Sequence, residues 1–384
     1  MQQQSSPTSS PRLRLFEPYY PLSVRDVIRD MLGRGEVFMG KKVKELEQRI
    51  SGYLGVMPEQ VVAVSSCTAA LQLVMAQTPR HGFEVLVPGL TMAATAHAVQ
   101  LSGNETRVVD VGRDLLISAE ICEEAWTERT GAILAVDYAG FMPDYKALQE
   151  VAHRHDALVI EDAAHSFGST MYGQKAGKLA DFACFSLYPT KPLQGLGGGI
   201  IVNNLVDQPR FHRMTRELRY YGITDRKGCD YDVRHLGGNF YMSDLSAAAA
   251  LEALKDIGPY GFRSSLEIRQ MVAKHYCSDL VERVPWARPM RYQEEAAYHL
   301  FPVVLDEGIE RDALQAYLLK WGIETGTHYK PLHWLSLYSG RPKGPTPYLD
   351  AIGKRVLTLP CHARMCKQDT EMVIHMLEQY KQGT

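Results

Sequence analysis

The segment LVIEDAAHSFGS, at residues 158–169, carries a short apolar run, then two acids, then small residues. It belongs to a series of strand patterns that alternate with helical patterns. Strands are predicted at residues 61–64, 85–87, 106–109, 132–136, 157–160, 182–186 and 199–202. Helices are predicted between them, at residues 68–75, 93–101 and 144–153. This alternation predicts an α/β fold in which a mainly parallel sheet is covered by helices on both faces, giving three layers.

The flanks of this region indicate how the chain divides. Residues 1–12 are mostly polar and rich in serine and proline, which predicts a disordered N-terminal tail. From residue 243 the pattern changes to long helices, at residues 243–257 and 264–284, followed by a short strand and two further helices. We therefore expect a large α/β domain over residues 13–257 and a smaller α+β domain over residues 258–384.

Charge and cysteine content exclude several classes of protein. The 42 basic and 44 acidic residues give a net charge of −2, and no long block has one sign. We therefore expect neither nucleic acid nor a membrane surface as a partner. The 7 cysteines are scattered without a C-x-x-C pair, which disfavours a disulfide framework or a zinc site. With no signal-peptide core or membrane-spanning stretch, the sequence predicts a cytoplasmic protein.

Three polar segments follow predicted strands, at the sheet edge where folds of this class bind ligands. The first is VSSCTAAL, at residues 64–71. Ser66, Cys67 and Thr68 begin a predicted helix, whose free N–H groups and dipole favour a phosphate. The same residues are also suited to ordinary helix capping, so this segment alone leaves both interpretations open.

The second segment is LVIEDAAH, at residues 158–165, in which the strand ends in two acids, Glu161 and Asp162. A carboxylate in that position can bind a metal, a ribose hydroxyl or a ring nitrogen, and it can equally cap a helix. His165 follows three residues later. A histidine so placed is more often a hydrogen-bonded core residue than a catalytic one.

The third segment is FSLYPTKPLQGLGGG, at residues 185–199. Lys191 stands between a strand end and a glycine-rich stretch, and Pro192 biases it away from helical geometry. The lysine precedes the glycines, so this is not a P-loop, and G-x-G-x-x-G is absent, which disfavours a dinucleotide site.

Together the three segments supply what a pyridoxal-phosphate site needs. Lys191 can form a Schiff base with the cofactor aldehyde. Asp162 can keep the pyridine nitrogen protonated, and the helix start at Ser66 can bind the phosphate. The sequence therefore predicts pyridoxal 5'-phosphate as the cofactor.

With these segments in place, the chain resembles the DegT-type sugar aminotransferase family, which has the aspartate-aminotransferase fold. The order and spacing of its motifs agree, and not only their residue types. The strongest matches are VIEDAAHSFGS (159–169), GKLADFACFSLYPTK (177–191) and GGGIIVNN (197–204). Further matches, over nearly the whole chain, include SSCTAALQL (65–73), VLVPGLTMAAT (85–95), GGNFYMSDLSAA (237–248) and THYKPLH (327–333).

The resemblance implies roles for single residues. Lys191 would hold the cofactor and move the substrate proton, while Asp162 pairs with the ring nitrogen. His165 would lie near the ring oxygen. The phosphate would be bound by Ser186 together with Ser66, Cys67 and Thr68.

Other implied roles involve a second subunit or depart from the family pattern. Asn239 would reach the phosphate of a neighbouring subunit, which implies a homodimer with shared active sites. Met92 stands where an aromatic residue commonly stacks on the cofactor ring, and a thioether can still pack there. Three further positions depart from the family pattern. The family commonly has glycine at the position of Cys67, asparagine at that of Pro192 and arginine at that of Tyr241.

The substrate side of the site is implied in the same way. Tyr188 is expected to contact substrate, and a polar cluster in the smaller domain would close over the sugar. That cluster comprises His328, Tyr329, Lys330 and His333. The alternative is a surface loop with a chance pair of histidines, and a metal site is not expected because no third ligand is near.

We therefore expect a transaminase that moves an amino group from glutamate or glutamine to a keto group of a nucleotide-linked deoxysugar. The resemblance leaves other acceptors open, because a cyclitol ketone of the scyllo-inosose type would need the same chemistry. Dehydratases of this fold have a histidine in place of the lysine, so Lys191 favours transamination. A non-catalytic regulatory protein of the same fold would not need the Asp162 and Lys191 pair.

Overall fold

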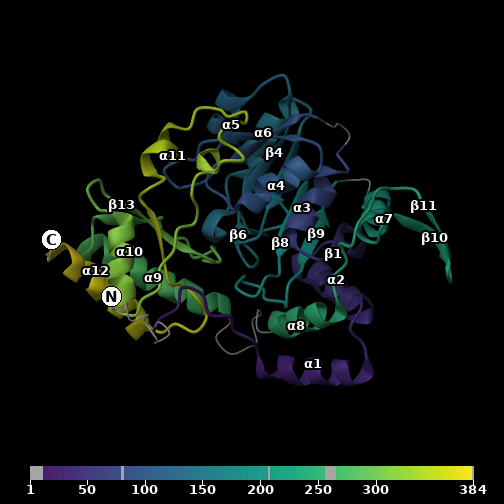
Figure 1. The fold of residues 1–384 in the computed structure, drawn as a ribbon, viewed down its shortest axis with the longest axis horizontal. Coiled ribbons are helices and arrows are strands. Elements are labelled where there is room, and N and C mark those ends of the chain that lie inside the picture. The colour runs from purple at the N-terminus through teal and green to yellow at the C-terminus, as the bar shows by residue number, and fades with distance from the viewer. Residues whose placement is uncertain (1–11, 79–81, 206–207, 256–264, 383–384) are drawn as a thin grey trace, which may run out of the picture.

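The computed structural model describes residues 12–78, 82–205, 208–255 and 265–382, and Figure 1 labels most of its elements. Its helices are α1 (Leu22–Arg34), α2 (Lys41–Leu54), α3 (Cys67–Met75), α4 (Ala93–Leu101), α5 (Ala119–Ala125), α6 (Tyr145–Arg154), α7 (Gln208–Arg219), α8 (Asp244–Lys255), α9 (Ser265–Arg283), α10 (Arg311–Lys320), α11 (Pro347–Ile352) and α12 (Lys367–Gln382). Short 3-10 turns are η1 (Pro58–Gln60), η2 (Tyr138–Gly140) and η3 (Leu332–Trp334).

The strands are β1 (Val61–Val64), β2 (Glu84–Pro88), β3 (Glu105–Val109), β4 (Thr130–Val136), β5 (Leu158–Asp162), β6 (Thr170–Met171), β7 (Gln174–Lys175), β8 (Phe182–Ser186), β9 (Gly199–Asn203), β10 (Ile223–Lys227), β11 (Asp230–Val233), β12 (Ala287–Pro289), β13 (Phe301–Leu305) and β14 (Val356–Leu359). The predicted tail over residues 1–12 lies outside the described residues, except for Arg12. The predicted domain boundary at residues 257 and 258 also lies outside them.

A seven-stranded sheet forms the centre of the described structure, in the order β1-β9-β8-β5-β4-β2-β3. The strands from β8 to β3 all pair in parallel. β9 runs antiparallel to both of its neighbours, β8 and β1. The prediction of a mainly parallel sheet is confirmed, and β9 is the exception that the sequence pattern did not indicate.

Helices cover both faces of this sheet (Figure 1), because alternate residues of each buried strand point to opposite sides. In β1, Val61 and Ala63 pack with residues of α2, α6 and α8. Val62 and Val64 pack on the other face, with residues of α3, α4 and α7. The three predicted layers are therefore confirmed.

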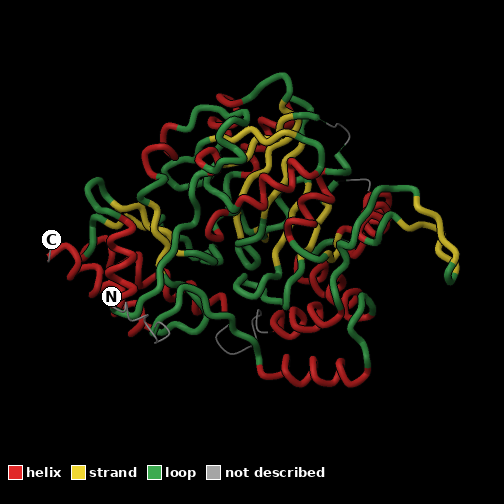
Figure 2. Tube along the Cα trace, in the orientation of Figure 1, coloured by secondary structure: helices red, strands yellow, loops and turns green. Residues whose placement is uncertain are grey.

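A smaller antiparallel sheet, β12-β13-β14, lies beside the central one and packs with α9, α10 and α12 (Figure 2). Its core includes the buried side chains of Tyr276, Leu314 and Leu377. The first described residues also join this region, because Leu13 forms a bridge with Ile323. Residues after 265 thus bury an apolar core that is largely their own.

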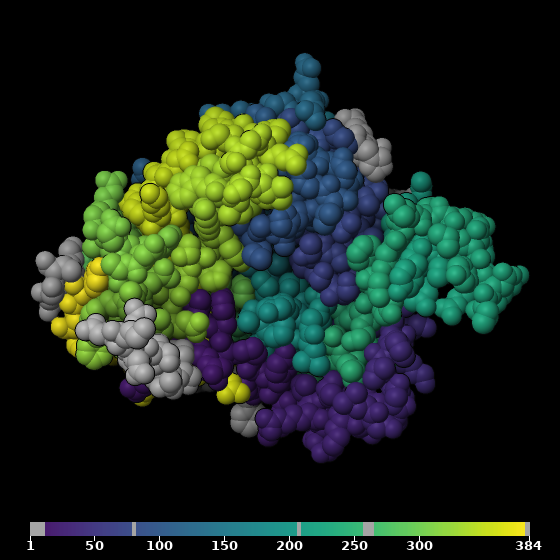
Figure 3. All heavy atoms as spheres, viewed as in Figure 1, coloured from purple at the N-terminus to yellow at the C-terminus, as the bar shows by residue number. Residues whose placement is uncertain are grey.

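The hairpin of β10 and β11 stands away from the rest of the chain (Figure 3). Tyr231 and Val233 are 55% and 53% exposed, and Leu236 just after the hairpin is fully exposed. All four residues of β11 are exposed, and so are residues 225–227 of β10, whereas Thr224 at the base of the hairpin is buried.

The sheet brings the three polar segments to one edge. β5 and β8 are parallel neighbours, with Asp162 opposite Cys184, so both end at the carboxyl edge. Ser66 forms a bridge with Gly198 at the start of β9. None of the helices within the described ranges combines the length and apolar character that crossing a bilayer requires.

Candidate active site

A cavity of about 490 Å³ opens at this carboxyl edge. Asp162, His165, Ser186 and Lys191 all line it. Asp162 and His165 come from one of the predicted segments, and Ser186 and Lys191 come from another. Three chain regions that follow β5, β8 and β1 meet here, as expected for a parallel sheet of this class.

Asp162 ends β5 with its carboxylate buried and hydrogen-bonded. Its Oδ2 accepts from Thr95 Oγ1 at 2.7 Å, and its Oδ1 accepts from the Ala164 N–H at 3.2 Å. Burial raises the pKa of Asp162, while the hydrogen bonds from Thr95 and Ala164 and the charge of Lys191 oppose that rise. These hydrogen bonds fix the direction of the carboxylate, and a positive partner would favour its ionised form.

Lys191 lies in the turn after β8, where its backbone N–H donates to the Tyr188 carbonyl at 2.9 Å. Its Nζ lies 3.3 Å from His299 Nε2. Burial lowers the pKa of Lys191 to about 8, with Asp162 and Cys67 opposing the shift and Arg269 adding to it. About a tenth of this amine is therefore free at pH 7, far more than for a lysine of ordinary pKa.

His165 has a defined tautomer. Its Nδ1 accepts from the Ala139 N–H at 3.2 Å, so the ring proton of the neutral form lies on Nε2. Nε2 is 3.3 Å from the Tyr329 hydroxyl. Burial, followed by the charges of Lys191 and His328, lowers the pKa of His165 well below its usual range. His165 is thus a neutral N–H donor that faces the cavity.

The start of α3 forms one end of the cavity. Ser66 Oγ accepts from the Ala69 N–H at 3.1 Å, so the predicted capping contact is present. Cys67 and Thr68 still present first-turn N–H groups, which lack acceptors inside the helix. A Cβ atom at Gly199 would lie 2.4 Å from the Ser66 backbone. Glycine at this position therefore allows the two backbone segments to approach each other closely.

The cavity mouth has a different character. Met92 and Tyr188 line it and are 54% and 59% exposed. Tyr329 and His328 also line the cavity, and His328 Nδ1 lies 3.0 Å from Thr358 Oγ1. Burial lowers the pKa of His328 to about 4, so this ring is neutral as well.

Three predicted site residues lie outside the cavity. Lys330 is exposed and does not line it. His333 turns away in η3, where its Nε2 lies 2.8 Å from Asp350 Oδ1. Asn239 is exposed, and its backbone forms a bridge with Tyr220.

Sequence reasoning missed three residues that complete the walls. Thr95 donates to Asp162, and His299 contacts Lys191. Phe16 stacks on His299, with ring centroids 5.7 Å apart. Thr95 lies one helical turn after Met92 in the quoted motif, so helical spacing could have indicated it. His299 and Phe16 carry no local signal, because each reaches the cavity from a distant part of the chain.

The residues present fit pyridoxal phosphate. Asp162 and Lys191 line the same cavity yet form no ion pair with each other, which leaves space between carboxylate and amine. A neutral N–H donor, His165, lies beside that space. First-turn N–H groups of α3 and the Ser186 hydroxyl lie at the end suited to a phosphate.

Comparison with known proteins points the same way. Residues 23–378 match the model of the DegT/DnrJ/EryC1/StrS aminotransferase family. The chain is 30% identical over 363 residues to the UDP-4-amino-4,6-dideoxy-N-acetyl-beta-L-altrosamine transaminase of Campylobacter jejuni, covering 90% of this chain and 92% of that protein.

Solved structures resemble the chain along almost its full length. A sugar aminotransferase, Spr1654, from Streptococcus pneumoniae in its PMP-form is 26% identical with a TM-score of 0.88, covering 97% of this chain and 98% of that one. Helicobacter pylori PseC, an aminotransferase of pseudoaminic acid biosynthesis, has a TM-score of 0.88 over 97% of this chain and 100% of its own. At 22% identity, that second likeness supports the fold alone.

Proposed function

This chain belongs to the DegT/DnrJ/EryC1/StrS aminotransferase family and is a pyridoxal-phosphate-dependent transaminase; from that premise we propose that it aminates a keto group of a nucleotide-linked deoxysugar. The observation that carries the proposal is the cavity shared by Lys191, Asp162 and His165. Its members are the amine, the carboxylate and the neutral donor that such a transfer needs.

We propose that four parts of the chain hold the cofactor. When bound, pyridoxal phosphate supplies an aldehyde that links to amines and a ring that accepts electrons from the substrate. Asp162 would pair with the ring nitrogen and His165 Nε2 would donate to the ring oxygen. The α3 start, from Ser66 to Thr68, and Ser186 would bind the phosphate. Met92 would pack against the ring face.

Lys191 would act twice. It would bind the cofactor through Nζ, and once released it would move a proton at the substrate carbon. A base needs a free amine at working pH, and a pKa of about 8 supplies it. The neighbouring rings of His165 and His299 are neutral, because burial lowers the pKa of each well below its usual range.

Asp162 would keep its charge because its new partner is positive. Burial alone raises its pKa, but a protonated ring nitrogen at hydrogen-bond distance favours the ionised form. Thr95 and Ala164 fix the carboxylate, so it would hold the ring in one orientation. A fixed ring decides which face of the substrate meets Lys191.

We propose glutamate or glutamine as the amino donor. The full-length relative from Campylobacter jejuni is named for a UDP-linked amino-dideoxysugar, which supports a nucleotide sugar over a cyclitol ketone as acceptor. We propose that Tyr188, Tyr329 and His328, at the mouth, contact the acceptor. Lys330 and His333 lie outside the cavity and are not needed for this role.

A second copy of this chain is the proposed partner. Exposed apolar residues of α1 and the hairpin, Leu22, Leu32, Tyr231, Val233 and Leu236, support an interface between copies. Asn239 follows the hairpin, is exposed, and does not line the cavity of its own chain, which suits a contact with the neighbour's phosphate. A cytoplasmic location stays a prediction.

A panel of half-reactions tests the acceptor. The loaded protein is first converted with glutamate, freed of small molecules, and then mixed with UDP- or dTDP-linked 4-keto-6-deoxysugars or with scyllo-inosose. We expect an aminated nucleotide sugar by mass spectrometry and recovery of the original absorbance. Amination of scyllo-inosose with none of the nucleotide sugars would contradict the proposal and favour the cyclitol alternative.

A further inference from the structure

Arg269 is the largest side chain among those that are buried almost completely, at 1% exposure. It lies in the first turns of α9. Among the described residues no carboxylate forms an ion pair with it, although buried arginines normally have one. Instead its guanidinium donates to main-chain carbonyl groups. A buried charge that is matched only by carbonyls is costly, so its position calls for a functional reason.

These carbonyls belong to three separate segments. Nη1 donates to Cys361 O at 2.8 Å, after β14, and to Tyr298 O at 3.3 Å, before β13. His299 O also lies 3.5 Å from Nη1. Nη2 donates to Thr190 O at 3.2 Å, in the turn after β8. One planar group therefore ties the smaller antiparallel sheet to the turn that carries Lys191.

The tied segments hold the two groups that meet in the cavity. Thr190 directly precedes Lys191, and His299 is one of the residues whose carbonyl faces Arg269. Lys191 Nζ and His299 Nε2 are 3.3 Å apart, from positions 108 residues apart in sequence. The guanidinium thus lies behind both partners of this contact and reaches the backbone of each.

We propose that Arg269 is a positioning residue: it fastens the Lys191 turn to the strand end that carries His299, and so holds Nζ of Lys191 against Nε2 of His299. This rests on the proposed function, in which Lys191 is the working amine. Arg269 lines no part of the cavity and touches neither substrate nor cofactor. It acts only through the two segments it joins.

Electrostatics supports the same role. The charge of Arg269 is among the influences that lower the pKa of Lys191, after burial, which is the largest. It also helps to lower the pKa of His299, together with burial and the charge of Lys191. A cation held behind this pair favours the free amine of Lys191 and the neutral ring of His299. Lysine could supply the charge, but only the planar fork of arginine reaches carbonyls on both sides.

The test measures the Lys191 amine directly, in the full chain without cofactor. The protein is acetylated briefly with acetic anhydride at a series of pH values, and modification of the Lys191 peptide is quantified by mass spectrometry. The wild-type midpoint is expected near pH 8. Arg269→Lys should raise the midpoint because the turn loosens and water reaches the amine. Arg269→Met should raise it further, and each unit of rise lowers reactivity at neutral pH about tenfold.

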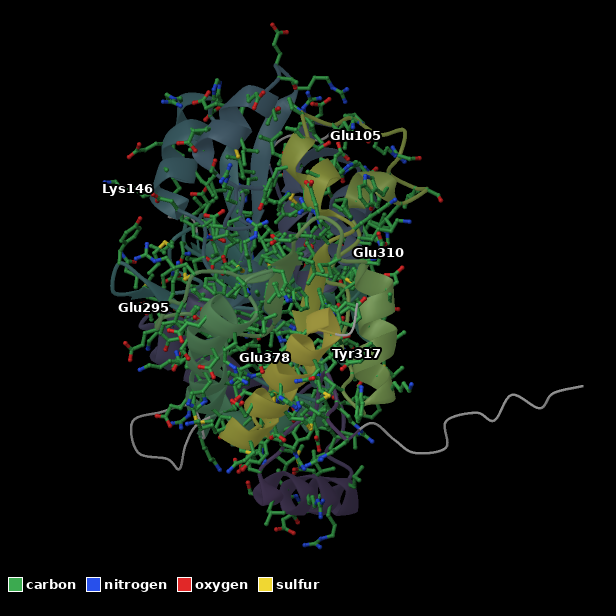
Figure 4. All side chains as sticks on the ribbon, turned by 90° about the vertical axis from the view of Figure 1, so that its left-hand side faces the viewer. Glu105, Lys146, Glu295, Glu310, Tyr317 and Glu378 are labelled. Atoms are coloured by element: carbon green, nitrogen blue, oxygen red, sulfur yellow. The ribbon has the colours of Figure 1, made fainter. Side chains whose placement is uncertain are left out.

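Arg283→Lys is the matched control. Arg283 lies on the same helix but at its far end, where it pairs with Glu378, labelled on α12 in Figure 4. This substitution should leave the Lys191 midpoint unchanged. In the loaded enzyme, Arg269→Lys should lower kcat about tenfold or more while KM for the amino donor changes less than about threefold, because positioning and not binding is impaired.

The outcomes separate the possibilities. A midpoint unchanged in folded Arg269→Lys contradicts the proposal and leaves Arg269 a structural residue, whatever its effect on melting temperature. Should Arg269→Met fail to fold, the lysine variant, which keeps the charge and most of the volume, decides. A wild-type protein that takes up no pyridoxal phosphate would contradict the proposed function. The acetylation needs no cofactor, so its midpoints would still test the role of Arg269.

Discussion

The floor of the cavity and the exposed hairpin are built in opposite ways. At the floor, Asp162, His165 and His299 are buried and in contact with partners from the same chain. At the hairpin, Tyr231, Val233 and Leu236 face solvent, and charged pairs such as Arg234 with Asp225 lie on the surface. The contacts of the first region all come from one chain, whereas the second region exposes apolar side chains to solvent.

This difference indicates which substitutions should affect catalysis and which should affect association between copies of the chain. Substitutions at the floor should remove chemistry and leave assembly intact, because the groups there are fixed by hydrogen bonds within the chain. Substitutions at the hairpin should act on assembly first, and on chemistry only through the missing neighbour. Four substitutions of decreasing effect test this contrast.

Lys191→Ala should have the largest effect. It removes both the cofactor link and the base, so we expect transamination to fall about 10⁴-fold or more. The measurement is the rate of keto-acid formation from glutamate. Lys146→Ala is the matched control, because Lys146 is an exposed lysine on α6, labelled in Figure 4, and its loss should leave the rate unchanged. Full activity in Lys191→Ala would remove the basis of the contrast.

Asp162→Asn should come next, with a loss of about 10³-fold in kcat, because an amide cannot stabilise a protonated ring nitrogen. The control is Glu161→Gln. Glu161 is the neighbouring residue on β5, and burial followed by the charge of Asp137 raises its pKa well above the usual range. A pKa raised in this way favours the protonated acid, which glutamine resembles in shape and charge, so glutamine should change kcat less than about threefold. Equal losses in the two variants would show that burial, and not ring pairing, explains the first.

Val233→Asp should have a smaller, indirect effect. A charge in the proposed interface should shift the protein toward single chains, by about 2 kcal/mol of association free energy. Sedimentation at several concentrations measures the shift, and activity should fall with it and recover at high protein concentration. Val281→Asp is the control, since Val281 on α9 is similarly exposed, at 62%. A wild-type protein that sediments as a single chain yet is fully active would contradict the shared-site proposal.

Met92→Phe should have the smallest effect. An aromatic ring would pack on the cofactor face at least as well as the thioether, so we expect cofactor affinity to rise about two- to fivefold with little change in kcat. Equilibrium dialysis against pyridoxal phosphate measures this. A large loss of affinity would show that Met92 does not lie against the ring face.

The sheet and the centre of the site could be predicted from the sequence because both leave local signals. Strand residues such as Val61 and Ile160 form short apolar runs; Asp162 lies at the end of one such run, and Lys191 lies in the turn after another. Parallel strands end at one edge, so residues after different strands meet without further information. The antiparallel direction of β9 was not predicted, because an apolar run of that length has no direction.

Other parts depend on contacts that no local pattern encodes. His299 and Arg269 act through atoms of segments far away in sequence, and Phe16 reaches the cavity from the first described residues. His333 belongs to the same short motif as His328, but the η3 turn directs it to Asp350 instead. The hairpin was missed because its charged, solvent-facing residues lack the alternation that marks a half-buried strand.

Reductive trapping tests the central claim most directly. The protein is loaded with pyridoxal phosphate, reduced with borohydride, digested and mapped by mass spectrometry. The account predicts one cofactor-derived adduct, on Lys191, with loss of the absorbance of the loaded protein on reduction. An adduct on another lysine, or a protein that takes up no cofactor, would contradict it.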